Sequence, residues 1–268
     1  SVEDIFDHLD GQDHVAFTGS ADTATVLRSH PTLLSRSVRF NAEADSLNAA
    51  ILGLAATPDT AEFDLFTTEV VREMTVKAGQ KCTAIRRALV PASQIDTMAD
   101  ALAGALAEIR VGDPADEATT MGALVGTTQR DEVRGAVMSL RSATNVVVDT
   151  CTFHDVDPDV GAFLAPTLLR ATDANARSIH TTEAFGPVCT LIGYDDLDSA
   201  VRLAALGAGS LVASVVTPDV DEATALTLGI AAHHGRVHVL DASTAATSTG
   251  HGSPLPNLVH GGPGRAGG

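Results

Sequence analysis

Aromatic side chains and lysines are scarce in this sequence of 268 residues. Aromatic residues make up 3% of the chain, tryptophan is absent, and Lys77 and Lys81 are the only lysines. Because 44% of the residues are nevertheless apolar, alanine, valine and leucine must fill the core through many small contacts. The length allows one large domain or two smaller ones.

Cysteine is also rare, and its pattern excludes two classes of small protein. The three cysteines, Cys82, Cys151 and Cys189, are odd in number and show no Cys-x-x-Cys spacing. A disulfide framework and a zinc knuckle are therefore not indicated. The histidines at 233–234, 251 and 260 have no metal-ligand spacing either, so we expect no metal site and assign them to surface or loop packing.

Basic residues are too few to offset the acidic ones, and the formal net charge is −17. This charge argues against a nucleic-acid groove and against binding to an anionic membrane surface. The apolar run Leu203–Val216 is interrupted by two glycines and is shorter than the roughly 20 residues of a membrane span. No basic-then-apolar leader opens the sequence, and we expect a soluble, cytoplasmic protein.

Short apolar stretches alternate with segments of helical periodicity along most of the chain. Strands are expected at 14–18, 37–41, 84–90, 145–148, 165–169, 188–194, 210–216 and 236–240. Helices are expected at 22–29, 63–76, 95–109, 129–142, 197–205 and 219–230, and residues from 243 onward are expected to form loops. Alternation of this kind predicts an α/β fold with a mostly parallel sheet.

Four ordered motifs carry the functional signal. The first is the segment 79–83, Gly-Gln-Lys-Cys-Thr, with Arg87 five residues after Cys82. The others are Phe-Thr-Gly-Ser at 17–20, Val-Gly-Asp-Pro at 111–114 and Glu-Ala-Phe-Gly-Pro at 183–187. In the order given, they resemble the nucleophile loop, the strand-to-helix turn, the Val-Gly-Asp-Pro loop and the Glu-x-Phe-Gly-Pro segment of the aldehyde dehydrogenase superfamily. The resemblance covers essentially the whole chain.

Two further segments resemble one branch of that superfamily. Glu-Ala-Asp-Ser at 43–46 replaces the usual Glu-Leu-Gly-Gly, and the glycine-rich end at 258–268 follows the same branch. This branch oxidises CoA-linked semialdehydes in aerobic degradation of phenylacetyl-CoA and benzoyl-CoA. The resemblance thus implies NAD(P)-dependent oxidation of a CoA-linked aliphatic semialdehyde, with NAD or NADP as cofactor and a homo-oligomeric parent enzyme.

The resemblance assigns catalysis to Cys82 and Glu43. A thiolate can add to an aldehyde carbon, and the ordinary thiol pKa near 8.5 usually has to be lowered for this role. Glu43 matches the general base that activates water for thioester hydrolysis. Without the resemblance, Cys82 would be read as a buried thiol and Glu43 as a surface carboxylate. Lys81 either adds positive potential beside the thiol or faces solvent.

Four residues match cofactor contacts in the family. Gly19 and Ser20 open a helix after a strand, where free backbone N–H groups favour a phosphate. Glu183 and Phe185 match the contacts to the ribose and the nicotinamide. The alternative for the first pair is an ordinary turn, and for the second a capped turn with a core phenylalanine.

The family match also predicts the domain organisation. Residues 1–43 correspond to the end of a Rossmann-like cofactor domain, 44–242 to the catalytic domain, and 243–268 to a loop-rich return segment that resembles a wall of the substrate tunnel. Family members are about twice as long, and an upstream oxyanion-hole asparagine has no counterpart here. The chain alone is therefore expected to be almost inactive.

Two other functions stay open on sequence grounds. The chain could be a truncated, non-catalytic module for assembly or acyl-CoA binding. A thioester hydrolase or acyltransferase that uses Cys82 would need a histidine beside the thiol, and no motif supplies one.

Overall fold

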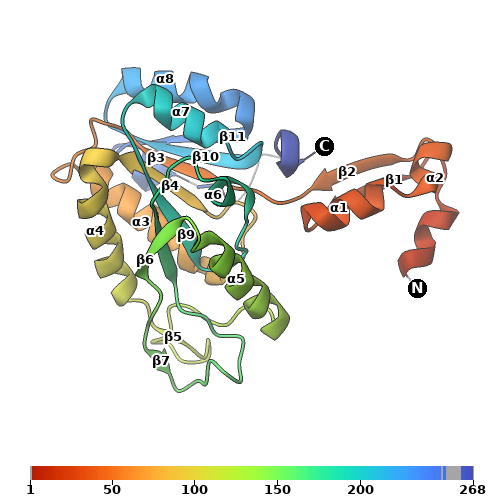
Figure 1. Ribbon diagram of the computed structural model, residues 1–268, viewed down its shortest axis with the longest axis horizontal. Helices are drawn as coiled ribbons and strands as arrows, with labels where there is room; N and C mark the ends of the chain where they lie inside the picture. Colours follow the sequence, from red (N-terminus) through yellow and green to blue (C-terminus); the bar gives the residue numbers. More distant parts are fainter. Residues whose placement is uncertain (1, 249, 252–260, 268) are drawn as a thin grey trace.

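A seven-stranded sheet forms the centre of the molecule (Figure 1). The computed structural model describes residues 2–248, 250–251 and 261–267. The strands run in the order β11-β10-β3-β4-β9-β8-β6, and all neighbours are parallel except β6 and β8. Their bounds are β3 Ala49–Leu52, β4 Arg87–Pro91, β6 Thr144–Val148, β8 Thr167–Ala171, β9 Val188–Tyr194, β10 Ser210–Val216 and β11 His234–Leu240. The expected α/β fold with a mostly parallel sheet is confirmed.

Helices cover both faces of this sheet (Figure 1). α3 (Ala61–Thr75) and α4 (Ile95–Ala107) lie on one face. α7 (Leu197–Ala205) and α8 (Val220–Ile230) lie on the other. Because side chains alternate along a strand, β3 sends Ala50 and Leu52 to the first core and Ala49 and Ile51 to the second.

A separate parallel pair, β1 (His14–Thr18) and β2 (Arg39–Glu43), extends away from the main sheet (Figure 1). The strands expected at 14–18 and 37–41 correspond to this pair, in which Val15 lies opposite Phe40. The short helices η1 (Val2–His8), α1 (Ala21–Arg28) and α2 (Pro31–Ser35) surround it. Its small core of Phe6, Leu33 and Val38 is independent of the two cores of the main sheet.

The remaining elements complete the lower part and the edges of the molecule. They are η2 Val76–Gly79, η3 Ala92–Gln94, β5 Val111–Gly112, α5 Thr127–Leu140, β7 Phe153–His154, α6 Arg177–Thr181, η4 Ala231–His233, η5 Ala245–Thr247 and η6 Gly264–Ala266. β5 and β7 pair in a two-residue parallel ladder, and α5 packs against α6.

Most element boundaries follow local chemistry that the sequence already contains. Ser20, Thr60, Asp196 and Asp219 each cap a helix by accepting a hydrogen bond from a backbone N–H of its first turn, the usual role of these side chains. The sequence expectations for α3, α7, β9 and β10 match the observed bounds to within about two residues.

Several expectations about elements were wrong. The strand expected from Ala84 begins only at Arg87. Residues 82–83 form a turn, and residues 84–86 connect that turn to the strand without regular structure. The strand β3 and the short helices α2 and α6 were missed. Among the described residues, no helix is long and apolar enough to cross a membrane.

Candidate active site

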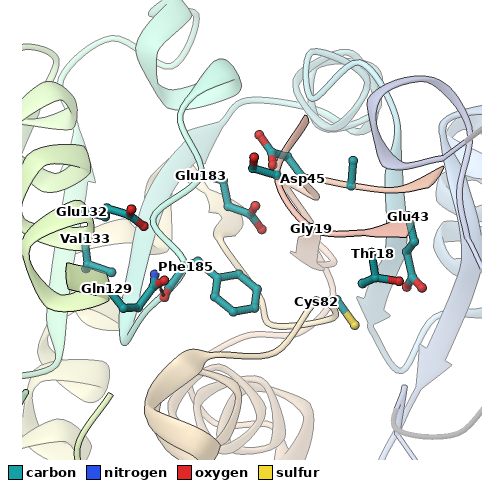
Figure 2. A pocket seen from close by; sticks show the side chains of 12 residues that line it. Thr18, Gly19, Glu43, Asp45, Cys82, Gln129, Glu132, Val133, Glu183 and Phe185 are labelled. Atoms are coloured by element: carbon teal, nitrogen blue, oxygen red, sulfur yellow. Dashed lines mark hydrogen bonds between the residues drawn. The ribbon is translucent and has the colours of Figure 1, made fainter. Parts of the chain in front are cut away.

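The six site residues predicted from sequence line one cavity of about 390 Å³ (Figure 2). The cavity lies between the carboxyl ends of β1 and β2 and the loops that precede β4 and β9. Its lining comprises Thr18, Gly19, Ser20, Glu43, Ala44, Asp45, Cys82, Gln129, Glu132, Val133, Glu183 and Phe185. Residues separated by up to about three fifths of the chain are thus brought together only by the fold.

Cys82 lies on a turn and is half-buried. It packs against the apolar cluster of Leu211, Val212 and Ala266. The residues that lead to this turn have left-handed backbone conformations, with φ of 55° at Lys77, 51° at Ala78 and 69° at Gly79. A non-glycine residue rarely adopts such a φ, so this approach to Cys82 must be held by contacts from outside it.

The buried side chain of Asn48 supplies part of that support. Its amide nitrogen donates to the carbonyl oxygens of Cys82 and Ala84 at 2.8 and 2.9 Å. Its amide oxygen accepts from the Val212 N–H at 3.1 Å and from the Ser46 hydroxyl at 2.6 Å. One side chain therefore ties the Cys82 turn to β10 with every polar atom satisfied.

The electrostatic surroundings raise the pKa of Cys82. Partial burial is the main cause, and the negative charge of Glu43 adds to it, while Arg236 acts in the opposite direction. Lys81 follows neither of the two sequence alternatives fully: it is half-buried, and its ammonium lies 2.8 Å from both carboxylate oxygens of the buried Glu73.

Glu43 is the last residue of β2 and lies beside Cys82 in the cavity (Figure 2). Its backbone carbonyl accepts a hydrogen bond from the Gly19 N–H at 3.1 Å. The same residue therefore closes the β1–β2 pair through its backbone and presents a carboxylate to the thiol through its side chain.

Glu183 and Phe185 reach the cavity from the loop between α6 and β9, and both side chains point into it (Figure 2). Burial raises the pKa of Glu183 to about 7, and the nearby Arg86 guanidinium opposes this rise. The Phe185 ring centroid lies 5.3 Å from the Arg86 guanidinium carbon. The Phe185 carbonyl accepts from the Gln129 amide at 3.0 Å, which ties this loop to α5.

The amino end of α1 is already partly occupied by protein groups. Ser20 caps the helix by accepting from the Thr23 N–H at 3.2 Å. The Ala21 N–H donates to the Asp45 carboxylate at 2.9 Å. An acidic side chain thus sits where the sequence pattern predicted a phosphate contact, and it replaces a glycine of the usual family motif.

The other cysteines and histidines form no second reactive centre in the described part of the chain. Cys189 is fully buried, which raises its pKa to about 12. Cys151 is half-buried against an apolar cluster. His234 is buried at the start of β11, contrary to the expected surface or loop position, whereas His251 is packed within a loop. Over residues 2–248, 250–251 and 261–267, no group of three or more histidine, cysteine or acidic side chains could hold a metal ion; His260 lies outside the described residues.

Sequence reasoning missed three polar residues of this site: Asp45, Asn48 and Arg86. Asp45 stood out as a departure from Leu-Gly-Gly, but its contact with α1 had no local signal. Asn48 and Arg86 act on residues far from them in the sequence, as in the Arg86 bond to Gly186, 100 positions away. From the apolar residues that flank them in the sequence, one could expect only that Asn48 and Arg86 are buried, not which groups they bind.

Comparison with known proteins supports the family resemblance. Residues 2–252 match the aldehyde dehydrogenase family. The 3,4-dehydroadipyl-CoA semialdehyde dehydrogenase of Aromatoleum evansii is 49% identical over 98% of this chain and 52% of its own length. Geranial dehydrogenase of Castellaniella defragrans is 31% identical over 81% of this chain and 43% of its own length.

Solved structures show the same fold. Betaine aldehyde dehydrogenase of Staphylococcus aureus, in its apo form, superimposes with a TM-score of 0.83 at 24% identity, covering 98% of this chain and 50% of that one. The same enzyme in complex with NAD+ gives a TM-score of 0.80 at 24% identity, covering 95% of this chain and 48% of that one. The chain spans about half the length of the curated relatives that it matches. It belongs to the aldehyde dehydrogenase family.

Proposed function

We propose that this chain carries the catalytic half of an NAD(P)-dependent dehydrogenase that oxidises a CoA-linked aliphatic semialdehyde to the carboxylic acid. The observation that supports this most is the convergence of Cys82, Glu43, Glu183 and Phe185 on one cavity. No single segment of the sequence could bring a thiol, a carboxylate and the cofactor-side residues together.

Cys82 is proposed as the nucleophile. Its sulfur adds to the aldehyde carbon and forms a thiohemiacetal. Loss of the hydroxyl proton to solvent and of a hydride from the same carbon to an oxidised nicotinamide would then leave a thioester on Cys82. The half-buried turn leaves the sulfur accessible from the cavity. Because the pKa of Cys82 is raised, the thiolate forms more readily as pH increases, or once a neighbouring base removes the proton.

Glu43 is proposed as the general base of the second half-reaction. Its carboxylate takes a proton from a water molecule, the resulting hydroxide attacks the thioester carbonyl, and the acid leaves as the Cys82 thiol is restored. The nearness of Glu43 to Cys82, which is close enough to raise the thiol pKa, suits this role.

NAD or NADP is the proposed cofactor, and when bound it would accept the hydride. Glu183 and Phe185 lie on the Cys82 cavity and fit the nicotinamide end. The fit at the phosphate end is poorer, because the Asp45 carboxylate already accepts from the Ala21 N–H. Gly19 and Ser20 would therefore hold a phosphate beside this carboxylate rather than at a bare helix end.

The substrate class follows from the relative at 49% identity, whose name specifies a CoA-linked semialdehyde. A role in degradation of aromatic compounds, a cytoplasmic location and a homo-oligomeric parent enzyme are part of the same proposal. The competing proposal is a non-catalytic module for assembly or acyl-CoA binding, and the raised pKa of Cys82 is the observation that favours it.

Kinetics of the full-length enzyme expected to contain this chain would test the proposal. Cys82→Ala should abolish aldehyde oxidation. Glu43→Gln should spare the first hydride transfer more than turnover, so that a burst of reduced cofactor precedes a trapped acyl-enzyme. Turnover of Glu43→Gln at the wild-type rate would exclude Glu43 as the base.

Labelling of the chain alone would separate the two proposals. Selective alkylation of Cys82 by mild iodoacetamide would favour a reactive site, whereas equal labelling of Cys82 and Cys151 would favour the non-catalytic module. The chain alone should produce negligible NADH or NADPH, because loss of one oxyanion donor already costs roughly 10²–10³ in rate.

A further inference from the structure

Two buried arginines follow one another after the Cys82 turn, and they have different surroundings. The Arg87 guanidinium bonds to the carbonyls of Leu47, Leu203 and Ala204 and to a ring nitrogen of His180. None of these partners lines the candidate active-site cavity. Arg87 therefore connects elements within the core and does not contact the cavity.

Arg86 instead contacts two loops that both reach the cavity. One guanidinium nitrogen donates to the Gly79 carbonyl at 2.8 Å and to the Lys81 carbonyl at 3.2 Å. Another donates to the Gly186 carbonyl at 2.8 Å. One planar, buried group thus joins the loop that carries Cys82 to the loop that carries Glu183 and Phe185.

The two loops are also in direct backbone contact at this point. A Cβ at Gly79 would lie 2.1 Å from the Gly186 carbonyl oxygen. The left-handed conformations of Lys77 and Ala78 beside it are unfavourable on their own. The hydrogen bonds from Arg86 to Gly79 and Lys81 are among the contacts that can hold this conformation.

The side chains of the second loop also face Arg86. The Arg86 Nε lies 3.8 Å from the Glu183 carboxylate, and this nitrogen is buried without a hydrogen-bond partner. The Phe185 ring lies over the guanidinium group. A small movement of Glu183 toward Arg86 would give that nitrogen a hydrogen-bond acceptor. Because the same guanidinium donates to the carbonyls of Gly79 and Lys81, a shift of Glu183 would also act on the Cys82 loop.

We propose that Arg86 is a positioning residue that couples the Cys82 turn to the cofactor-side loop at 183–187, so that the two loops shift together. The inference rests on the proposed function, because it presumes that these loops carry the nucleophile and the cofactor contacts. A fixed relation between them matters because hydride transfer requires the reacting atoms to lie about 3–3.5 Å apart.

The test uses iodoacetamide alkylation of Cys82 in the complete 268-residue chain, with rates followed by mass spectrometry across pH. This readout needs no dehydrogenase activity, so it can fail independently of the proposed function. Arg86→Lys keeps the positive charge but loses the planar guanidinium, whose separate nitrogens bond to the two loops. It should change the alkylation rate roughly tenfold, equivalent to about 1.4 kcal/mol. It should also move the pH midpoint of the reaction.

Arg87→Lys is the matched control, since this side chain is equally buried but contacts no lining residue. It should lower the melting temperature without changing the rate or the pH midpoint of Cys82 alkylation. If Arg87→Lys altered Cys82 as much as Arg86→Lys does, general loosening of the core would explain both, and the coupling would be rejected. Arg86→Gln gives the same comparison if the lysine variant does not fold.

A double-mutant cycle then tests the coupling itself. Phe185→Leu should change Cys82 alkylation in the parent chain and have a much smaller effect in the Arg86→Lys chain, because coupled residues give non-additive effects. Equal effects of Phe185→Leu in both backgrounds would show that Phe185 acts on Cys82 without Arg86 and would overturn the inference.

Discussion

At the scale of single residues, the site combines groups whose charges oppose one another. Partial burial is the main cause that raises the pKa of the Cys82 thiol, the Glu43 carboxylate adds to this rise, and Arg236 opposes it. A carboxylate beside the proposed nucleophile disfavours the thiolate but is well placed to activate water for hydrolysis. The two proposed half-reactions therefore place conflicting demands on Glu43.

This conflict leads to a prediction for Glu43→Gln in the 268-residue chain. Removal of the negative charge should lower the Cys82 pKa, so alkylation at pH 8 should become faster by roughly threefold to tenfold. Alkylation rates measured from pH 6 to 10 would show the midpoint shift downward. Glu132→Gln is the control, because Glu132 lines the same cavity but is not among the main causes of the Cys82 pKa shift. An unchanged or raised midpoint in Glu43→Gln would contradict the assignment.

A second prediction concerns Asn48. Asn48→Asp should replace the two donated hydrogen bonds to Cys82 and Ala84 by repulsion between the carboxylate and those carbonyls. We expect a loss of about 2–4 kcal/mol in the free energy of unfolding and a slower, less selective alkylation of Cys82. Urea denaturation gives the first quantity. Asn175→Asp, at an exposed asparagine that accepts from Arg202, should leave both unchanged.

The sequence could identify the residues whose chemistry is local but not those that act across the fold. Cys82 and Glu43 were predicted from short motifs, and the cavity contains both. Asn48 gives no such signal, since its partners other than Ser46 lie 34 to 164 positions away along the chain. Nothing near Asn48 in the sequence specifies that it must satisfy two carbonyls and an amide.

At the scale of elements, strongly periodic helices and long buried strands were predictable, whereas short ones were not. β9 and β10 are seven residues long and apolar, and their bounds matched. β3 has only four residues, Ala-Ala-Ile-Leu, of which only the isoleucine is β-branched. Its strand conformation comes from pairing with β10 and β4 on either side, which local composition does not reveal.

The connection from α3 to the Cys82 turn supplies the prediction at this scale. Gly79→Ala would place a Cβ 2.1 Å from the Gly186 carbonyl oxygen, at a residue with φ of 69°. The atoms that this Cβ would meet belong to the backbone of Gly186 and Pro187, which cannot rotate away as a flexible side chain can. We therefore expect a loss of at least about 2–3 kcal/mol in the free energy of unfolding. Denaturant titration measures this loss, and alkylation should show a more exposed Cys82.

Gly104→Ala provides the matched control for Gly79→Ala. Gly104 lies in α4 with no atom within 4 Å of the added Cβ. The substitution should therefore stabilise the chain by about 0.5–1 kcal/mol. If Gly79→Ala were tolerated as well as Gly104→Ala, the close contact between the two active-site loops would have to be abandoned.

At the scale of the whole molecule, three histidines are buried in different parts of the structure. His180 accepts from the Arg87 guanidinium and lies 2.7 Å from the Ala174 carbonyl. His234 contacts the Ile230 carbonyl at the end of α8, and His251 contacts the hydroxyl of Ser214 on β10. Burial is the main cause that lowers their pKa values, to about 4, 4 and 3.

These histidines predict that the fold loses stability in mild acid. Each folded-state pKa lies below the ordinary value of 6.5, so the unfolded chain binds more protons as pH falls from about 6.5 toward 4. The stability that each neutral ring contributes is therefore complete above pH 6.5 and is lost below it, by about 2 kcal/mol for His180 at pH 5. Urea titrations at pH 5 and 7.5 would measure the difference in the free energy of unfolding.

His180→Gln keeps an acceptor for Arg87 but cannot take up a proton, so it should reduce the difference in the free energy of unfolding between pH 5 and 7.5. His8→Gln, at an exposed position, should not change it, and an equal pH dependence in all three chains would rule out His180 as a source of acid sensitivity.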